Sequence, residues 1–72
     1  DEIIAPITGK VNKLNVKEGD FVKKDEVLVT IESMKMEMII SSPQDAFVEK
    51  VYCKEGEIVV QGKLLLKLKF SL

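Results

Sequence analysis

The chain has 72 residues and a formal net charge of −1, and 32% of its residues are charged. A chain of this length forms one small domain with a thin core, which leaves little room for a deep active-site cleft. Its basic residues are all lysines, they do not outnumber the acids, and arginine is absent. Nucleic acid is therefore not expected as a partner, because phosphate binding and guanine recognition both favour a basic surplus with arginine.

Histidine is absent, and Cys53 is the only cysteine. Catalysis by a histidine acid or base and a tight zinc site are therefore excluded. A single cysteine cannot form an internal disulfide, which favours a reducing compartment, either the cytoplasm or an organelle matrix. No apolar run approaches ~18 residues, so we predict no direct membrane insertion. The chain opens on Asp1 without a methionine, and we expect a fragment of a larger protein or a processed chain.

Short apolar runs separated by glycine, proline and charged residues predict β-strands, because no window keeps the apolar spacing of a helix for long. The predicted strands cover residues 2–5, 10–16, 21–22, 27–31, 38–41, 46–53, 58–59 and 64–70. Residues 7–9 are predicted to form a turn, and Gly19 and Gly56 are predicted to adopt positive φ in two others. Short strands at this even spacing are typical of an all-β sandwich or flattened barrel.

The sequence matches itself without a gap when it is shifted by 37 positions. Ala5-Pro6 falls on Ser42-Pro43, and residues 11–22 fall on residues 48–59. Two copies in one short chain predict a single domain with an internal pseudo-two-fold axis, and not a longer repeat array.

We assign residues 1–72 to one domain made of two quasi-repeats, about 1–34 and 36–71. The joint between the copies lies at Lys35, and its symmetry equivalent is the place where the chain ends meet. The symmetry therefore predicts Lys35 at one end of the domain and both termini at the other.

Both copies share an irregularity in their second strand. The apolar alternation slips between Val11 and Leu14, and it slips at the equivalent place between Val48 and Val51. A slip that occurs twice predicts a shared β-bulge or sharp bend, which curls a sheet.

The joint breaks a local rule of turn chemistry. A two-residue hairpin turn usually contains glycine or asparagine, because both of its residues need positive φ. Here the tip is predicted to be Met34-Lys35, although this chain has glycines available at its other turns. Such exceptions are typical of functional sites, so we interpret Lys35 as a lysine that becomes modified.

Methionines surround this lysine at positions 34, 36 and 38. Methionine is flexible and polarisable, and it suits contact surfaces that adapt to a partner. The ordinary explanation is that alternating methionines on a strand belong to the core and that lysines only solvate the surface. The joint and the unusual turn place the functional interpretation on an equal footing with this ordinary one.

The stretch Glu32-Ser33-Met34-Lys35-Met36-Glu37 resembles the attachment motif of biotinyl domains, the biotin carboxyl carrier domains of biotin-dependent carboxylases and decarboxylases. Residues 19–22, residues 42–43 and residues 56–65 also resemble this family's pattern, so the similarity covers essentially the whole chain. It implies a flattened β-barrel, a barrel-sandwich hybrid of two four-stranded antiparallel sheets, with the lysine on an exposed hairpin.

The resemblance also implies a non-catalytic carrier function. Lys35 would be biotinylated by a biotin protein ligase, with Met34 and Met36 helping to position it. The covalent biotin would then shuttle CO₂ between a biotin carboxylase and a carboxyltransferase or decarboxylase.

Three features depart from the usual pattern or narrow it. Ser33 stands where many biotinyl domains have alanine, and Asp25 stands where a glycine is frequent, which predicts a strained turn there. The segments 11–19 and 48–56 are equally long, so the protruding thumb of some bacterial carriers is expected to be absent.

Three other functions compete with the biotin carrier. A lipoyl carrier domain would share the fold and the lysine, and Glu32 stands where lipoyl domains often have glutamate, but the flanking methionines favour biotin. An unmodified β-barrel interaction module would lack the lysine motif. A catalyst would have to use Cys53, which is expected to be a buried structural cysteine because reactivity needs a stabilised thiolate.

Overall fold

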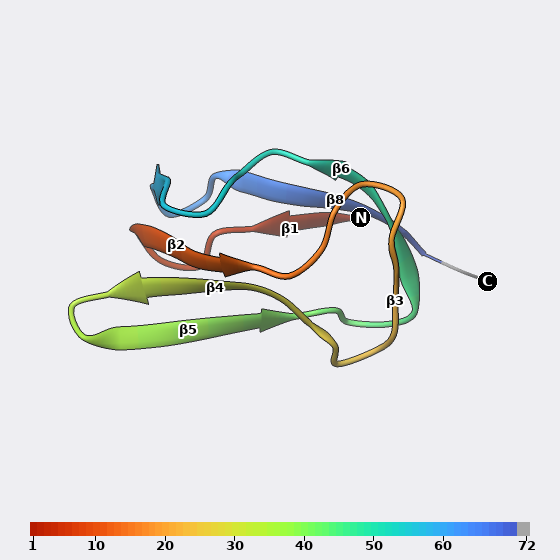
Figure 1. Ribbon diagram of the computed structural model, residues 1–72, viewed down its shortest axis with the longest axis horizontal. Coiled ribbons are helices and arrows are strands. Elements are labelled where there is room, and N and C mark those ends of the chain that lie inside the picture. Colours follow the sequence, from red (N-terminus) through yellow and green to blue (C-terminus); the bar gives the residue numbers. More distant parts are fainter. Residues whose placement is uncertain (71–72) are drawn as a thin grey trace.

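The computed structural model describes residues 1–70 as an elongated all-β molecule of 37 × 19 × 17 Å (Figure 1). The strands are β1 (Glu2–Ile4), β2 (Gly9–Leu14), β3 (Phe21–Val22), β4 (Val27–Ser33), β5 (Met36–Ser41), β6 (Ala46–Val51), β7 (Ile58–Val59) and β8 (Leu64–Phe70). No helix long and apolar enough to cross a membrane occurs within residues 1–70.

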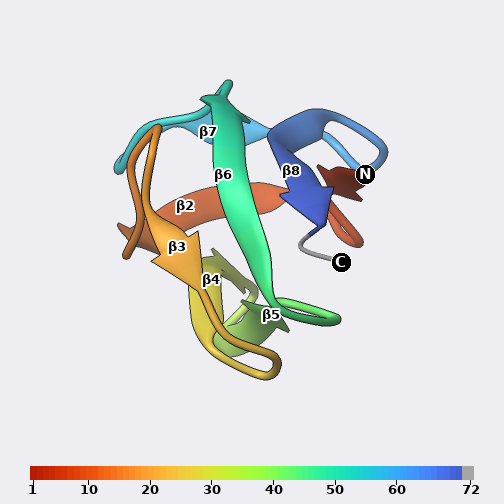
Figure 2. The same cartoon turned by 90° about the vertical axis from the view of Figure 1, so that its right-hand side faces the viewer.

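The strands form two four-stranded antiparallel sheets, with the orders β1-β8-β6-β3 and β5-β4-β2-β7. Figure 2 looks along the molecule from the end opposite the β4–β5 turn and shows strands of the two sheets enclosing a common interior. Each sheet combines strands from both halves of the chain. The predicted fold class is therefore confirmed.

The two sheets are related by the predicted internal symmetry. Replacing each strand of one sheet with its counterpart from the other half converts β1-β8-β6-β3 into β5-β4-β2-β7. The repeat shift also carries the bounds of β2, β3 and β4 onto those of β6, β7 and β8 without a residue of error. Because each half supplies edge strands to the other half's sheet, neither half could complete its sheet alone.

The shared bulge is present in both copies. The register shifts between Val11 and Lys13 in the β2–β4 pair, and between Val48 and Lys50 in the β6–β8 pair. At each shift the strand bends away from its ladder. Val11 and Val48 stand at these shifts, and their main-chain groups bind the other half of the chain.

The glycine turns of each half bind the bulge of the other half. Gly56 N–H donates to Val11 O, and Val11 N–H donates to Glu57 O, both at 2.8 Å. The symmetry-related bonds join Gly19 N–H to Val48 O and Val48 N–H to Asp20 O, again at 2.8 Å. The glycines have φ of 94° at Gly19 and 88° at Gly56, as predicted.

The core between the sheets is built from equivalent residues of the two halves. Its buried apolar members are Ala5, Val11, Val16, Val22, Leu28, Val29, Ile31, Ala46, Val48, Cys53, Val59, Leu65, Leu66 and Leu68. Val11 corresponds to Val48 under the repeat, and Leu28 corresponds to Leu65. Each half therefore contributes equivalent apolar side chains to the core. Burial of this kind is the main favourable contribution to folding.

Two strands, β2 and β6, each end two residues earlier than predicted. β2 ends at Leu14 and β6 ends at Val51, so Val16 and Cys53 are buried outside the strands. The N–H of each last residue donates to a carboxylate of the other half: Leu14 N–H donates to Glu55 and Val51 N–H donates to Glu18.

Gly9 was predicted to lie in a turn, but it begins β2. A Cβ built on Gly9 would lie 2.6 Å from the carbonyl oxygen of Glu32 and 2.9 Å from Ile31 Cγ2. Glycine here reflects the close approach of two backbones and not a change of direction. The neighbouring strand β4 carries the joint, so this contact fixes the base of the β4–β5 hairpin.

Replacement of Gly19 or Gly56 with valine is expected to lower the free energy of unfolding by ~1 kcal/mol or more, because a β-branched residue resists positive φ. The space around both glycines is open, so the effect reports backbone conformation and not a clash. Urea denaturation would measure it, with Lys17→Val and Lys54→Val as controls in the same turns. Equal midpoints for the glycine and lysine variants would contradict the prediction.

Candidate functional site

The joint is a tight hairpin turn between β4 and β5. The ladder of these strands extends to the pair Ser33–Met36, which leaves Met34 and Lys35 as a two-residue turn. Their φ angles are 50° and 68°, the combination that type I′ hairpin turns require. The predicted exception is therefore confirmed, and each such residue costs ~1–2 kcal/mol relative to a relaxed backbone.

The hairpin holds this strained turn because β4 is an interior strand. It pairs with β5 on one side and β2 on the other, and the register with β2 reaches Lys10 opposite Glu32. The backbone of Gly9 packs closely against Glu32 next to this pair, so β2 and β4 have no room to shift there. A turn overdetermined by its surroundings can keep an unfavourable backbone conformation.

The turn lies at one tip of the molecule. Figure 1 shows it at the far left, whereas the N-terminus and the end of β8 lie toward the opposite end. The predicted placement is thus confirmed for Asp1 and Phe70, while Leu72 falls outside the described residues. Lys35 stands at the point of the molecule farthest from that opposite end.

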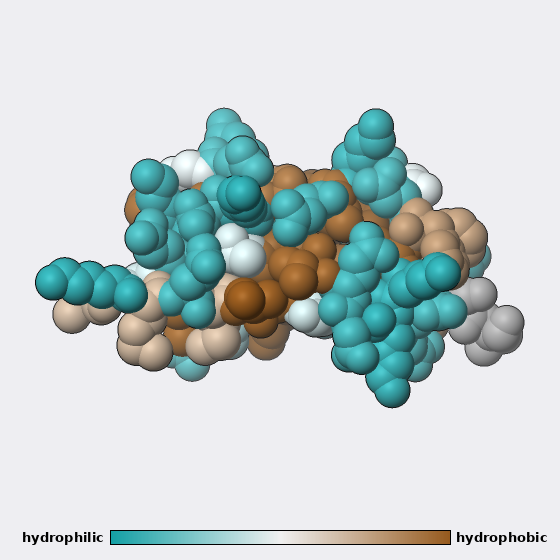
Figure 3. Space-filling model, turned by 60° about the horizontal axis from the view of Figure 1, so that its bottom comes forward, coloured by the Kyte–Doolittle hydropathy of each residue, from teal (hydrophilic) through white to brown (hydrophobic). Residues whose placement is uncertain are grey.

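The side chains of the turn face solvent. Lys35 is exposed, Met34 is 90% exposed and Met36 is 69% exposed, whereas Met38 is only half-buried. The core explanation therefore fails for Met34 and Met36, since truly core methionines would be buried. Figure 3 shows hydrophobic residues at the tip that carries the turn, next to hydrophilic surface.

Two acids flank the turn on the outer face of the sheet. Glu32 and Glu37 are directly opposite each other in the ladder, an arrangement that is unfavourable for like charges. Asn12 relieves it in part, because its Nδ2 donates to Glu37 Oε2 at 2.5 Å. Within residues 1–70 the one ion pair joins Lys63 to Glu57, so the ammonium group of Lys35 stays available.

An apolar hollow of about 170 Å³ opens beside the turn, on the inner face of the hairpin. It is lined by Ile7, Ser33, Met34, Met36, Glu37 and Met38. Ile7 carries no motif that marks it for a site, because it lies between β1 and β2 and reaches the hairpin only through the fold. The only local signal was an isoleucine within a predicted turn.

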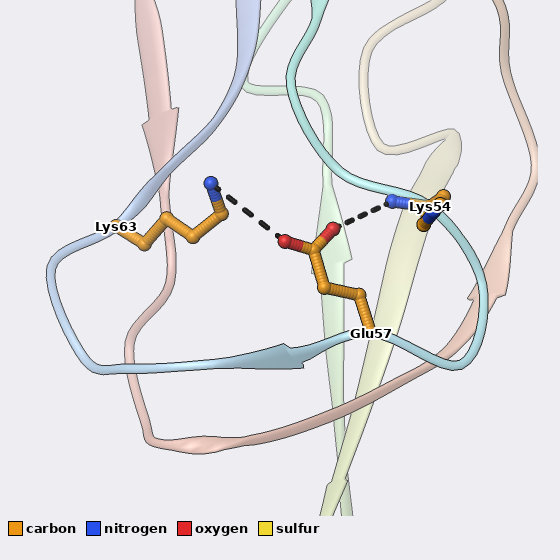
Figure 4. A network of polar contacts seen from close by, with 3 residues as sticks. All are labelled: Lys54, Glu57 and Lys63. Carbon is orange, nitrogen blue, oxygen red and sulfur yellow. Dashed lines mark hydrogen bonds and ion pairs between the residues drawn. The ribbon is translucent and has the colours of Figure 1, made fainter.

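The remaining candidate nucleophile, Cys53, lies in the core and is 8% exposed. Burial raises the pKa of its thiol, Glu57 raises that pKa further, and Lys63 acts in the opposite direction. Figure 4 shows Glu57 between two lysines, with Oε1 accepting from Lys54 N–H at 3.1 Å and Oε2 lying 3.9 Å from Lys63 Nζ. A raised pKa disfavours the thiolate, so this cysteine is structural.

Cys53 is expected to react with a thiol reagent far more slowly in the folded chain than in the urea-unfolded chain. The folded thiol keeps its proton at a pH where the unfolded thiol ionises, so the free energy of unfolding should fall as the pH rises through the ordinary thiol range. Cys53→Val, which copies the equivalent Val16, should flatten this alkaline decline. Rapid labelling of the folded chain would contradict the structural role.

The site is thus an exposed lysine on a tight turn at the tip of a small β-domain whose thiol is buried. Residues 1–68 match the family model of biotin/lipoyl domains, described as "Biotin-requiring enzyme". The chain belongs to this biotin/lipoyl attachment family. Its fold and its carrier class are those of the family.

The relatives include carboxylase subunits as well as a component whose name contains dihydrolipoyllysine. The chain is 38% identical over 65 residues to the biotin/lipoyl attachment protein of Bacillus subtilis, covering 90% of this chain and 89% of that protein. It is 45% identical over 53 residues to subunit alpha of mitochondrial methylcrotonoyl-CoA carboxylase from Rattus norvegicus, covering 74% of this chain. It is 44% identical over 73 residues to the dihydrolipoyllysine-residue acetyltransferase component of the pyruvate dehydrogenase complex from Pseudomonas aeruginosa, covering 94%.

The chain spans only 7% of that carboxylase subunit and 13% of that acetyltransferase component. Among solved structures, the lipoyl domain of the 2-oxoglutarate dehydrogenase complex from Azotobacter vinelandii matches with a TM-score of 0.82 and 34% identity, covering 93% of this chain and 92% of that one. The similarity therefore shows a covalent-cofactor carrier. Biotin and lipoate are both represented among these relatives.

Proposed function

We propose that the chain is a biotin carboxyl carrier domain and that Lys35 is its attachment site. The observation that carries this proposal is the Met34-Lys35 turn, which is strained, exposed and located at the tip of the molecule. A biotin protein ligase would transfer biotin from its adenylate. In that step the Lys35 Nζ forms an amide bond with the biotin carboxyl carbon, AMP leaves, and the amine loses its proton.

The flanking residues favour biotin over lipoate. Met34 and Met36 project their flexible thioethers into solvent on both sides of Lys35, which suits a partner that grips the turn through adaptable apolar contacts. The likeness to a methylcrotonoyl-CoA carboxylase subunit supports the same choice. The lipoyl alternative is kept because Glu32 and the acetyltransferase relative both favour it.

The chain contributes placement and reach. When bound, biotin supplies a ring nitrogen that accepts CO₂. The rigid hairpin keeps Lys35 away from the opposite end, so the tip can enter one partner's site after another while the domain stays outside. Covalent attachment replaces diffusion with a high effective concentration at each site.

The proposal includes specific partners and a compartment. Residues 1–72 form the biotinyl domain of two quasi-repeats, served by a biotin carboxylase and by a carboxyltransferase or decarboxylase. A cytoplasmic or organelle-matrix location fits the single buried thiol, which needs no oxidising environment. We propose no nucleic-acid partner.

Co-expression with a biotin protein ligase is expected to add one biotinyl group to the wild-type chain and none to Lys35→Arg, as measured by intact mass. Lys24→Arg serves as the matched control, because it changes another exposed turn lysine and should leave the adduct intact. A lipoate ligase is expected to give little or no adduct. A lipoyl adduct without a biotinyl adduct would favour the lipoyl carrier, and no adduct with either ligase would favour the unmodified module.

Met34→Ala and Met36→Ala are each expected to lower kcat/KM of biotinylation by about tenfold, equivalent to ~1.4 kcal/mol of lost contact with the ligase. Both side chains are exposed, so the free energy of unfolding should change by less than ~0.5 kcal/mol. Steady-state biotinylation and urea denaturation would separate the two effects. Val60→Ala is the control, since Val60 is 63% exposed and lies in another turn. Unchanged biotinylation kinetics would remove the methionines from the proposed site.

A further inference from the structure

The hollow beside the attachment turn breaks the internal symmetry. Under the repeat, Ser33 at the end of β4 corresponds to Phe70 at the end of β8. Phe70 is partly buried and packs against the core, whereas Ser33 is small and lines an opening. The end of the fold that carries Lys35 thus has a serine that lines a hollow, where the equivalent position of the other half has an aromatic ring.

The lining of the hollow is apolar. Three methionines and Ile7 form most of it, and Ser33 supplies a single hydroxyl. Glu37 belongs to the rim, but its carboxylate is drawn by Asn12 toward the outer face of the sheet. The hollow therefore suits hydrocarbon and sulfur, and it offers little to a charged ligand.

We propose that this hollow is an intramolecular resting site for the prosthetic arm attached to Lys35. Its occupant is the aliphatic chain and sulfur-containing ring of the biotinyl group, with the polar ureido edge left toward solvent. The inference rests on the proposed function and adds a place where the unloaded arm lies between transfers. Ile7, which lies outside the attachment turn, becomes a positioning residue for the arm.

Two observations favour the arm over an external partner as the occupant. Five of the six lining residues, all but Ile7, lie within three positions of Lys35, so a group on that lysine is already at high effective concentration. The hollow has a volume of about 170 Å³, which matches a small ring and not a protein segment that would need a continuous groove. When the arm lies in the hollow, apolar surface of the arm and apolar surface of the lining residues would both be removed from water.

The test uses the biotinylated chain with ¹³C-labelled isoleucine and methionine methyl groups. We expect nuclear Overhauser effects between the arm and the methyl groups of Ile7 and Met38, neither of which adjoins Lys35 in the sequence. The biotinylated chain should also unfold at a higher temperature than the unmodified chain, because the arm binds the folded state alone.

The matched variants are Ile7→Ala, which removes one wall of the hollow, and Ile39→Ala, which removes an exposed side chain from the opposite face of β5. Ile7→Ala should lose the Met38 contacts and the gain in melting temperature on biotinylation, and Ile39→Ala should keep both. If intact mass shows the adduct but the contacts and the gain are absent, the resting site is wrong and the carrier function stands. If no biotin adduct forms, both proposals fail.

Discussion

The structure depends on a reciprocal set of main-chain hydrogen bonds between its two halves. Each half has a valine next to its bulge, Val11 or Val48, and each half has a glycine turn that binds the N–H and C=O of that valine in the other half. The pairs Gly56–Val11 and Gly19–Val48 are the same contact seen from the two sides of the pseudo-two-fold axis. Because each bulge would otherwise bury unpaired polar groups, neither half is satisfied without the other.

These reciprocal bonds between the two halves determine how the two ends of the molecule differ. At one end the chain passes directly from β4 to β5, and at the equivalent place on the other side lie the ends of the described chain. At the first of these, the pairing of β4 with β5 holds a two-residue turn at the tip of the molecule. The strained φ angles of Met34 and Lys35 are tolerated because β4 is paired on both sides.

Much of this could be predicted because duplication makes the chain its own comparison. The Val11 and Val48 slips, the Gly19 and Gly56 turns and the strained Asp25, whose φ is 71° opposite Gly62 at 92°, were all visible as matched positions. The predictions were wrong where a residue contacts a segment that is distant in the sequence. Gly9 is small because of the Glu32 carbonyl, and Leu14, where β2 ends, donates its N–H to the distant Glu55.

The sequence by itself determined the all-β class, the two-fold repeat and the lysine at its joint, because strand periodicity and turn chemistry are local properties. Only the tertiary structure decided how far the strands run, that Met34 and Met36 face solvent, and that Ile7 meets the hairpin. Ser33 stands where the other half has Phe70, and it lines a hollow only once the sheets are packed. A hollow is formed by residues that are distant in the chain. Local patterns therefore single out Lys35, and packing determines the residues that surround it.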